Sequence, residues 1–188
     1  MTAMKPFSSL QGVLSLNVHP HKAPLGFSDA AVLLPLIGEH LVFTVRAANL
    51  ATHAGQISFP GGKVDEGESV IDAALREAWE EIKLPPQYVE LVGHLSPAFS
   101  PAGFRVLPLV GYVETPVELQ PNPEEVAELL WVPLDELLDI EPWSELRAVP
   151  GSDLKRTVWH YPWQGHDIWG VTGIIVHDLV ERLRRAKP

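Results

Sequence analysis

The sequence predicts an α+β fold in which helices pack on a mixed β-sheet. Strand-length apolar segments outnumber helical ones, and the two kinds do not alternate regularly, which argues against a doubly wound parallel sheet. The 18 prolines fall mostly between apolar segments, as is typical of short strands joined by loops. With 46 % hydrophobic and 20 % charged residues, the 188-residue chain has the composition of a globular protein rather than a disordered one.

The first part of the chain predicts three strands. Ala30–Pro35 and His40–Val45 are apolar and of strand length, and Gly38–Glu39 between them is typical of a hairpin turn. Gln56–Phe59 is a third short candidate, and it ends at Pro60–Gly62.

A change of period then predicts an amphipathic helix. It begins near Ser69 and ends at Pro85–Pro86, and its apolar residues recur at helical spacing: Ile71, Ala74, Leu75, Ala78 and Ile82.

Strands again outnumber helices in the second part of the chain. We expect strands at Val89–Leu95, Arg105–Val113 and Leu129–Val132, an edge strand at Thr157–Tyr161, and helices at Leu134–Leu138 and Gly173–Arg185. Pro121–Pro123 predicts a turn. The length predicts one domain over residues 1–188, with an N-terminal extension of about 25 residues.

Composition excludes several classes of protein. The chain has no cysteine, which removes disulfides, thiolate metal sites and cysteine nucleophiles. Its net charge of −10 and lack of a basic motif argue against nucleic-acid binding. No apolar run is long enough to span a membrane, and no export signal is evident, so the default expectation is a cytoplasmic protein. The sequence leaves monomer and homodimer open.

One face of the expected helix carries three glutamates. At about 100° per residue, Glu77, Glu80 and Glu81 fall within one arc of roughly 100°, nearly opposite the apolar arc. Like charges three and four residues apart destabilise a helix, and this arc contains no Lys or Arg. Ala73, one turn earlier, is small enough to let a ligand approach. The face is either ordinary solvated acid surface or a set of oxygen ligands for a hard divalent cation.

The loop before the helix favours the second interpretation. Gly61–Gly62 and Gly67 allow a close approach of backbone to a ligand. A glycine-bearing segment between a strand and a helix can present backbone groups to phosphates or a metal.

The spacing of these residues resembles the Nudix box, Gly-x5-Glu-x7-Arg-Glu-U-x-Glu-Glu-x-Gly-U, in which U is aliphatic. The box spans residues 62–84, with these matching positions: Gly62, Glu68, Arg76, Glu77, Ala78, Glu80, Glu81 and Leu84. Lys83 stands where the family has the glycine that ends the helix, so the helix end departs from the family pattern.

The resemblance implies an α/β/α sandwich that hydrolyses a small-molecule diphosphate with Mg²⁺ or Mn²⁺. Glu77, Glu80, Glu81 and the Gly61 carbonyl would hold the metal, and Glu68 and Arg76 would support them. The general base would be Glu77 or Glu125. From the residues alone, Glu125 is equally a plain loop acid, and Arg76 could be an ordinary surface ion pair.

Three further segments resemble the coenzyme A pyrophosphatase branch of that family. They are Val42–Ala47, His53–Gly62 and Ile168–Gly173, although Ala47 replaces the usual serine. The branch implies cleavage of coenzyme A or its derivatives to 3′,5′-ADP and 4′-phosphopantetheine. Arg46, His53 and Gln56 are candidate substrate contacts because the phosphates need donors. His53 could equally be a structural histidine.

Three alternatives remain beside this interpretation. The first is another nucleoside diphosphate derivative as substrate, such as ADP-ribose. The second is a non-catalytic Nudix-like binding module, which the intact box carboxylates disfavour. The third, isopentenyl-diphosphate isomerase, shares the fold but relies on a cysteine that this chain lacks.

Overall fold

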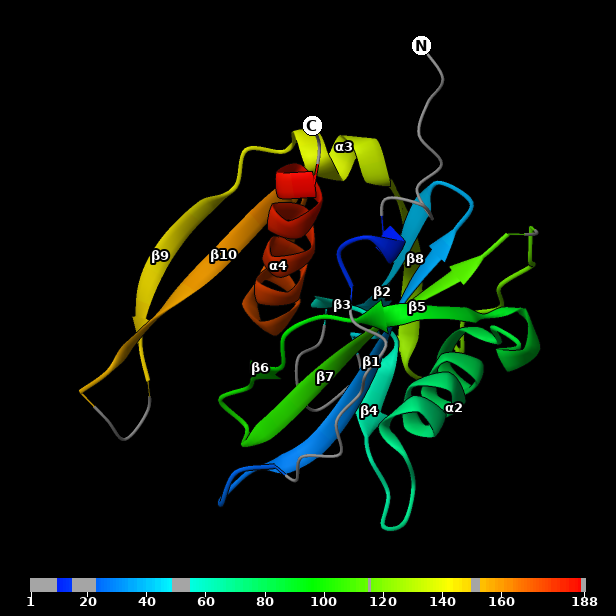
Figure 1. The fold of residues 1–188 in the computed structure, drawn as a ribbon, viewed down its shortest axis with the longest axis horizontal. Helices are drawn as coiled ribbons and strands as arrows, with labels where there is room; N and C mark the ends of the chain where they lie inside the picture. The colour runs from blue at the N-terminus through cyan, green and yellow to red at the C-terminus, as the bar shows by residue number, and fades with distance from the viewer. Residues whose placement is uncertain (1–9, 15–22, 49–54, 115, 150–152, 187–188) are drawn as a thin grey trace.

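The structure, a computed structural model, describes residues 10–14, 23–48, 55–114, 116–149 and 153–186. It is an α+β sandwich of the expected α/β/α kind, with a mixed sheet between two helices (Figure 1). The main sheet contains β1 (Ser28–Ile37), β2 (His40–Arg46), β3 (Ile57–Ser58), β4 (Gly61–Lys63), β5 (Glu90–His94), β6 (Ala98–Phe99), β7 (Phe104–Val113) and β8 (Val126–Pro133). Helix α2 (Val70–Ile82) lies on one face and α4 (Gly170–Ala186) on the other.

Strand β1 organises the sheet. It pairs in parallel with β7 along its whole length and antiparallel with β2 and β4, while β8 pairs with β2 and both β5 and β6 pair with β7. Consecutive residues Leu33 and Leu34 are both fully buried, because one faces α2 and the other faces α4. A strand covered on both faces reads as an uninterrupted apolar run, which the sequence shows at this place.

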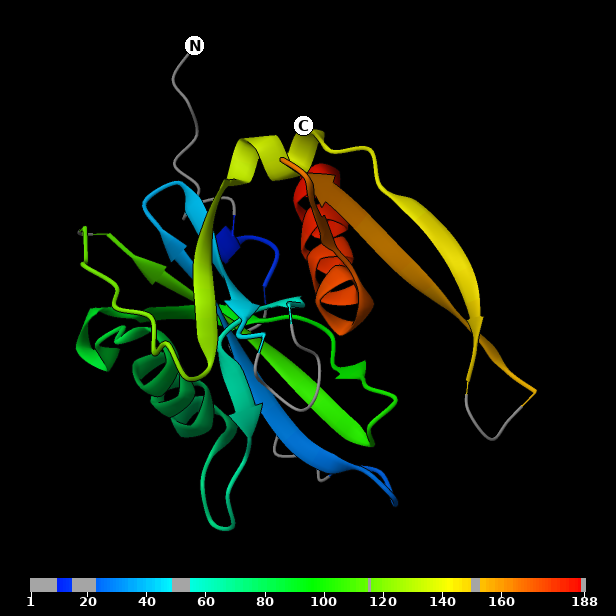
Figure 2. The same cartoon turned by 180° about the vertical axis from the view of Figure 1, so that it is seen from behind.

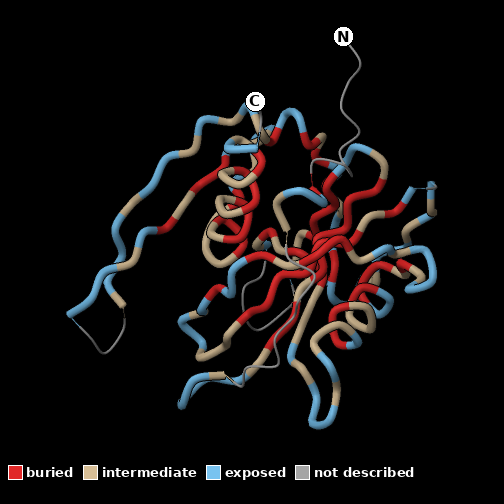
Figure 3. Tube along the Cα trace, in the orientation of Figure 1, coloured by how far each residue is buried: buried red, intermediate tan, exposed pale blue. Residues whose placement is uncertain are grey.

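The two faces of the sheet have separate hydrophobic cores. Ala74, Ala78 and Ile82 of α2 pack against one face, and Ile175 and Leu179 of α4 pack against the other. Figure 3 shows the buried positions concentrated along the sheet and on the sides of both helices that face it.

A second, three-stranded sheet follows in the chain. It has the order β11-β10-β9, formed by β9 (Trp143–Ala148), β10 (Lys155–Trp163) and β11 (His166–Ile168), and it packs beside α4 (Figure 2). Helix α3 (Leu134–Asp139) precedes it. The expected edge strand at Thr157–Tyr161 is therefore wrong in its position, because β10 is the central strand. Its two neighbours gave no clear signal, since β9 is mostly exposed and β11 is only three residues long.

The strands that the sequence missed are short. Gly61–Gly62, expected as loop, belong to β4 and pair with Ala31 and Val32 of β1. Strand β6 has only two residues, and a short 3₁₀ turn, η1 (Pro86–Tyr88), follows α2. Nothing among the helices of the described ranges combines the length and apolarity needed to cross a membrane.

Candidate active site

Helix α2 begins as the sequence predicts. Ser69 is its N-cap, and the Ser69 hydroxyl accepts a hydrogen bond of 3.0 Å from the Asp72 N–H. The far end differs from the family pattern in residue type but not in shape. Lys83 adopts the left-handed conformation, with φ 56°, that a glycine normally supplies, and its N–H bonds the Ala78 and Trp79 carbonyls.

The acidic face of α2 is only partly open to solvent, because Glu80 is exposed but Glu81 is buried. Glu81 is only 6 % exposed, and Ala73 is completely buried in the core rather than leaving room for a ligand. The expectation of an acidic arc opposite the apolar one is wrong at these two residues. The reason is that Glu81 faces β4, where it accepts from the Gly61 N–H, and Ala73 packs into the core between α2 and β1, while Trp79 and Glu80 are exposed.

Strand β4 brings backbone directly against two of the glutamates. The Gly61 N–H donates to Glu81 Oε1 at 3.3 Å. A Cβ atom at Gly62 would overlap the Glu77 carboxylate, and one at Gly61 would overlap the β1 backbone at Ala31. Packing against the β1 backbone therefore requires glycine at Gly61, whereas glycine at Gly62 leaves space for the Glu77 carboxylate.

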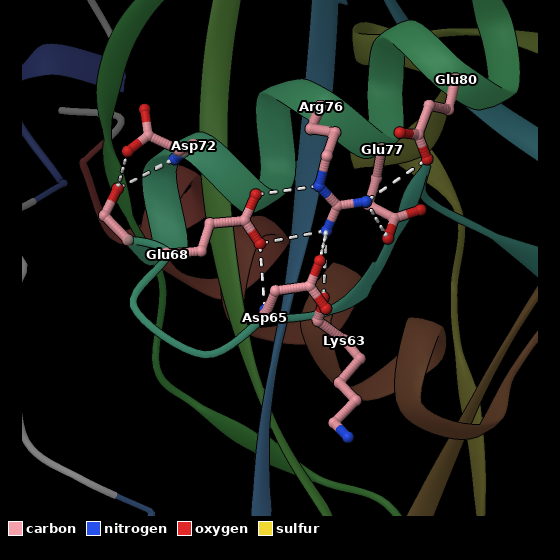
Figure 4. A network of polar contacts seen from close by, with 8 residues as sticks. Lys63, Asp65, Glu68, Asp72, Arg76, Glu77 and Glu80 are labelled. Carbon is pink, nitrogen blue, oxygen red and sulfur yellow. Dashed lines mark hydrogen bonds and ion pairs between the residues drawn. The ribbon is translucent and has the colours of Figure 1, made fainter.

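Arg76 is the centre of a polar network beside the glutamates (Figure 4). Its Nε and Nη2 donate to the two oxygens of Glu68 at 2.8 and 3.1 Å, a bidentate pair. Its Nη1 donates to Glu77 Oε1 at 2.9 Å and to Glu80 Oε2 at 3.3 Å. Arg76 Nη2 also donates to the Lys63 carbonyl at 3.2 Å. The guanidinium thus ties the loop after β4 to the acidic face of α2.

The segment before β8 closes over the end of α2. The Gln120 N–H donates to the Ile82 carbonyl at 2.9 Å, and the Asn122 N–H donates to the Glu81 carbonyl at 2.7 Å. The Ala47 N–H donates to the Glu125 carbonyl at 2.9 Å. The pattern Pro121–Pro123 predicts a turn but gives no sign that Asn122 contacts α2; within the turn, Asn122 Oδ1 accepts from the Glu124 N–H, as asparagine commonly does.

The carboxylates in this cluster perturb one another. Burial, reinforced by the charges of Glu77 and Glu125, raises the pKa of Glu81 to about 8, although the Gly61 N–H and Arg46 oppose the shift. Burial likewise raises the pKa of Glu77, against the opposing effect of Arg76. The structure therefore brings Glu77, Glu81 and Glu125 within electrostatic reach of each other.

The pKa of Glu68 behaves in the opposite way. Its hydrogen bonds with Arg76 hold that pKa below the ordinary value. Glu68 therefore stays ionised and keeps Arg76 in place.

The expected substrate contacts lie at the neighbouring end of β2 and β3. The Arg46 N–H donates to the Gln56 carbonyl at 3.0 Å, so these residues face each other across the hairpin. Arg46 is close enough to lower the pKa of Glu81, and its Nε is buried without a hydrogen-bond partner among the described residues. His53 lies outside the described residues.

The donor set suits a hard divalent cation in its chemistry. All its possible ligands are oxygen atoms, from Glu77, Glu80, Glu81 and the Gly61 carbonyl. A bound cation would also offset the cost of burying the negative charges of Glu77 and Glu81. In the described ranges, however, no group of three or more His, Asp or Glu side chains is arranged to hold a metal ion. Arg76 Nη1 donates to one oxygen of Glu77 and to one oxygen of Glu80, and the second oxygen of each carboxylate lies outside these two hydrogen bonds.

Comparisons with known proteins agree on one family. The NUDIX domain matches residues 27–150. The chain is 42 % identical over 175 residues to the "Uncharacterized Nudix hydrolase NudL" of Photorhabdus laumondii subsp. laumondii, covering 91 % of this chain and 93 % of that protein. It is 40 % identical to the NudL of Pectobacterium atrosepticum, over 80 % of each chain.

Solved structures support the fold. A NUDIX hydrolase from Nitrosomonas europaea superposes with a TM-score of 0.57 at 15 % identity, covering 90 % of this chain and 78 % of that one. The MutT protein from Methanosarcina mazei Go1 superposes with a TM-score of 0.54 at 20 % identity, covering 87 % and 97 %. Together with the box residues on α2 and β4, these matches place the chain in the Nudix hydrolase family.

Proposed function

We propose that this Nudix hydrolase cleaves the diphosphate bond of coenzyme A, or of a coenzyme A derivative, to 3′,5′-ADP and 4′-phosphopantetheine. Mg²⁺ or Mn²⁺ would be held by Glu77, Glu80, Glu81 and the Gly61 carbonyl. When bound, such an ion neutralises phosphate charge and lowers the pKa of a coordinated water.

The observation that carries the proposal is that three glutamates and the side chain of Arg46 lie close together near the end of α2. The charges of Glu77 and Glu125 raise the pKa of Glu81, the charge of Glu125 also raises the pKa of Glu77, and Arg46 lowers the pKa of Glu81. Crowded carboxylates that resist ionisation are suited to general-base catalysis. Glu77 and Glu125 are the two candidates for the base.

The three segments that resemble the coenzyme A branch come together in the fold, which supports the choice of substrate. Val42–Arg46 lies in β2, and β2 pairs with Ile57–Ser58. The third segment opens α4, where the Thr172 hydroxyl donates to the Ile57 carbonyl at 2.9 Å. Arg46 is near enough to lower the pKa of Glu81, and its N–H donates to the Gln56 carbonyl, which supports a role for these two residues as donors to a diphosphate.

Product analysis tests the substrate. Incubation with coenzyme A, ADP-ribose and diadenosine polyphosphates under Mg²⁺ or Mn²⁺, followed by identification of the products, should give 3′,5′-ADP from coenzyme A. If coenzyme A stays intact while ADP-ribose is cut, the branch assignment fails although the Nudix chemistry stands. If none of these diphosphates is cut, the result favours the alternative that the chain is a non-catalytic Nudix-like binding module.

Substitution of Glu81 tests the proposed metal ligand. Glu81→Gln keeps the volume and removes the charge, so we expect turnover to fall by about a hundredfold or more while the fold is retained. Glu66→Gln, in the exposed loop before α2, is the matched control and should leave turnover unchanged. A Glu81→Gln enzyme that turns over normally at saturating metal would contradict the assignment.

A further inference from the structure

Strand β9 is an open edge of the three-stranded sheet. The order β11-β10-β9 leaves the outer side of β9 without a paired strand in the described part of the chain. Figures 1 and 2 show β9 and β10 as an arm that projects away from the main sheet, with β9 outermost. Natural proteins protect an edge with proline, a bulge, a cover or charged side chains. Strand β9 has neither proline nor a shift in register, and its charged residues are Glu145 and Arg147.

The hydrogen bonding of the hairpin indicates which backbone groups face outward. The Val149 N–H donates to the Leu154 carbonyl at 2.9 Å, so position 149 faces β10. Direction alternates along an antiparallel strand, and the backbone groups of Ser144, Leu146 and Ala148 therefore point away from β10. The outward N–H and C=O groups of β9 can therefore pair with one more strand.

Two large apolar side chains of β9 are exposed. Leu146 is 67 % exposed and Trp143 is 50 % exposed. Glu145 and Arg147 lie on either side of Leu146 in the sequence. Their side chains are on the same face of β9 and form an ion pair. Figure 3 shows most of β9 as exposed.

We propose that β9 pairs antiparallel with β9 of a second copy of this chain, around a two-fold axis at Leu146. Leu146 then lies opposite the partner's Leu146. Glu145 lies opposite the partner's Arg147, and Trp143 lies opposite the partner's Val149. Each heterologous pair occurs twice, as a two-fold interface requires. The Glu145 and Arg147 positions are non-hydrogen-bonded in the new ladder, where facing side chains approach most closely.

Charge selects this register over its neighbours. An axis at Glu145 would place that carboxylate opposite its own copy, and an axis at Arg147 would do the same for the guanidinium. Like charges directly opposite in a ladder are destabilising. A shift by one residue would turn every side chain to the other face. The Leu146-centred register matches opposite charges and apolar side chains together.

The test is sedimentation velocity of the intact chain over a concentration series. Wild type should dimerise. Glu145→Arg alone and Arg147→Glu alone each create two repulsive pairs, so we expect the dimer dissociation constant to rise by about tenfold or more. Mixing these two variants should restore a heterodimer, because every Arg then faces a Glu. The double variant Glu145→Arg/Arg147→Glu should dimerise by itself.

Further variants separate the interface from general effects on folding or charge. Leu146→Pro removes an outward N–H while keeping both charged residues, and it should give a monomer. Glu118→Arg, on an exposed segment outside β9, changes the net charge by the same amount as Glu145→Arg and should leave dimerisation intact. A monomeric wild type at about 100 µM, well above the affinities of specific complexes, would overturn the proposal. So would single reversals that dimerise like wild type, or a mixture that stays monomeric.

Discussion

Glu81 is a buried carboxyl whose pKa, about 8, lies well above its ordinary value of 4.5. Without metal, the unfolded chain loses this proton at lower pH than the folded chain does. The stability that the proton provides is therefore complete below about pH 4.5 and is lost as pH rises toward 8. Between pH 5 and 8 we expect wild type to lose more stability than Glu81→Gln. The extra loss is about 1.4 kcal/mol for each unit by which the pKa of Glu81 differs between the folded and unfolded chains. Urea unfolding in EDTA measures this.

Glu66→Gln is the matched control for that experiment. Glu66 is exposed in the loop before α2 and is not among the groups that shift the pKa of Glu77 or Glu81, so its replacement should leave the difference between wild type and Glu81→Gln unchanged. Saturating Mg²⁺ should reduce the loss of stability in wild type, since a cation favours the ionised carboxylate. Parallel curves for wild type and Glu81→Gln would mean that the fold accommodates an ionised Glu81 without cost.

The sequence predicted the side chains of the site better than their surroundings. Spacing alone put Glu77, Glu80 and Glu81 on one face of a helix, because helical geometry is local. It did not predict that Glu81 would be buried while Glu80 stays exposed, since that depends on β4, a strand twenty residues earlier. The contacts of Asn122 and Arg76 could not be predicted for the same reason. Asn122 bonds the end of α2 and Arg76 bonds the Lys63 carbonyl, and a helical wheel does not contain these other segments.

At the scale of single elements, β4 packs against a strand on one side and a helix on the other. Gly61→Ala would push Cβ into the backbone of β1, which cannot move easily, so we expect a loss of stability of about 1–3 kcal/mol. Gly62→Ala would meet only the Glu77 carboxylate, which can turn away. That variant should keep nearly normal stability but lose turnover. Urea unfolding and kcat for both variants distinguish the two; equal losses of stability would contradict this division.

The end of α2 allows a second test on an element. Lys83 is held in the left-handed conformation that costs a non-glycine residue about 1 kcal/mol or more. Its ammonium lies 5.0 Å from the centre of the Trp79 ring, so a substitution also removes that contact. Lys83→Gly and Lys83→Ala both remove it, and we expect Gly to be more stable than Ala by about 1 kcal/mol. Thermal unfolding measures the difference, and equal midpoints would show that the conformation is not strained.

Elements with strong local signals were predicted well, and weak ones were missed. Helix α2 has a serine cap, apolar residues at helical spacing and a proline stop, and its predicted start agrees with the structure. Strands β4 and β6 are too short for a period to show, and β9 has no buried face. Their pairing with distant strands creates them, so the sequence of each segment alone could not predict them.

At the scale of the whole molecule, the packing of α4 connects the last part of the chain to the site. The buried Thr172 hydroxyl donates to the Ile57 carbonyl at 2.9 Å across 115 residues of sequence, and β3 leads directly into β4. Thr172→Val keeps the shape and removes the donor, so we expect a loss of about 1–2 kcal/mol in the free energy of unfolding. Thr172→Ser keeps the hydroxyl and loses only a methyl group. If urea unfolding finds Val as stable as wild type, the hydrogen bond does not hold α4 to β3, and the contact between these distant segments depends on apolar packing alone.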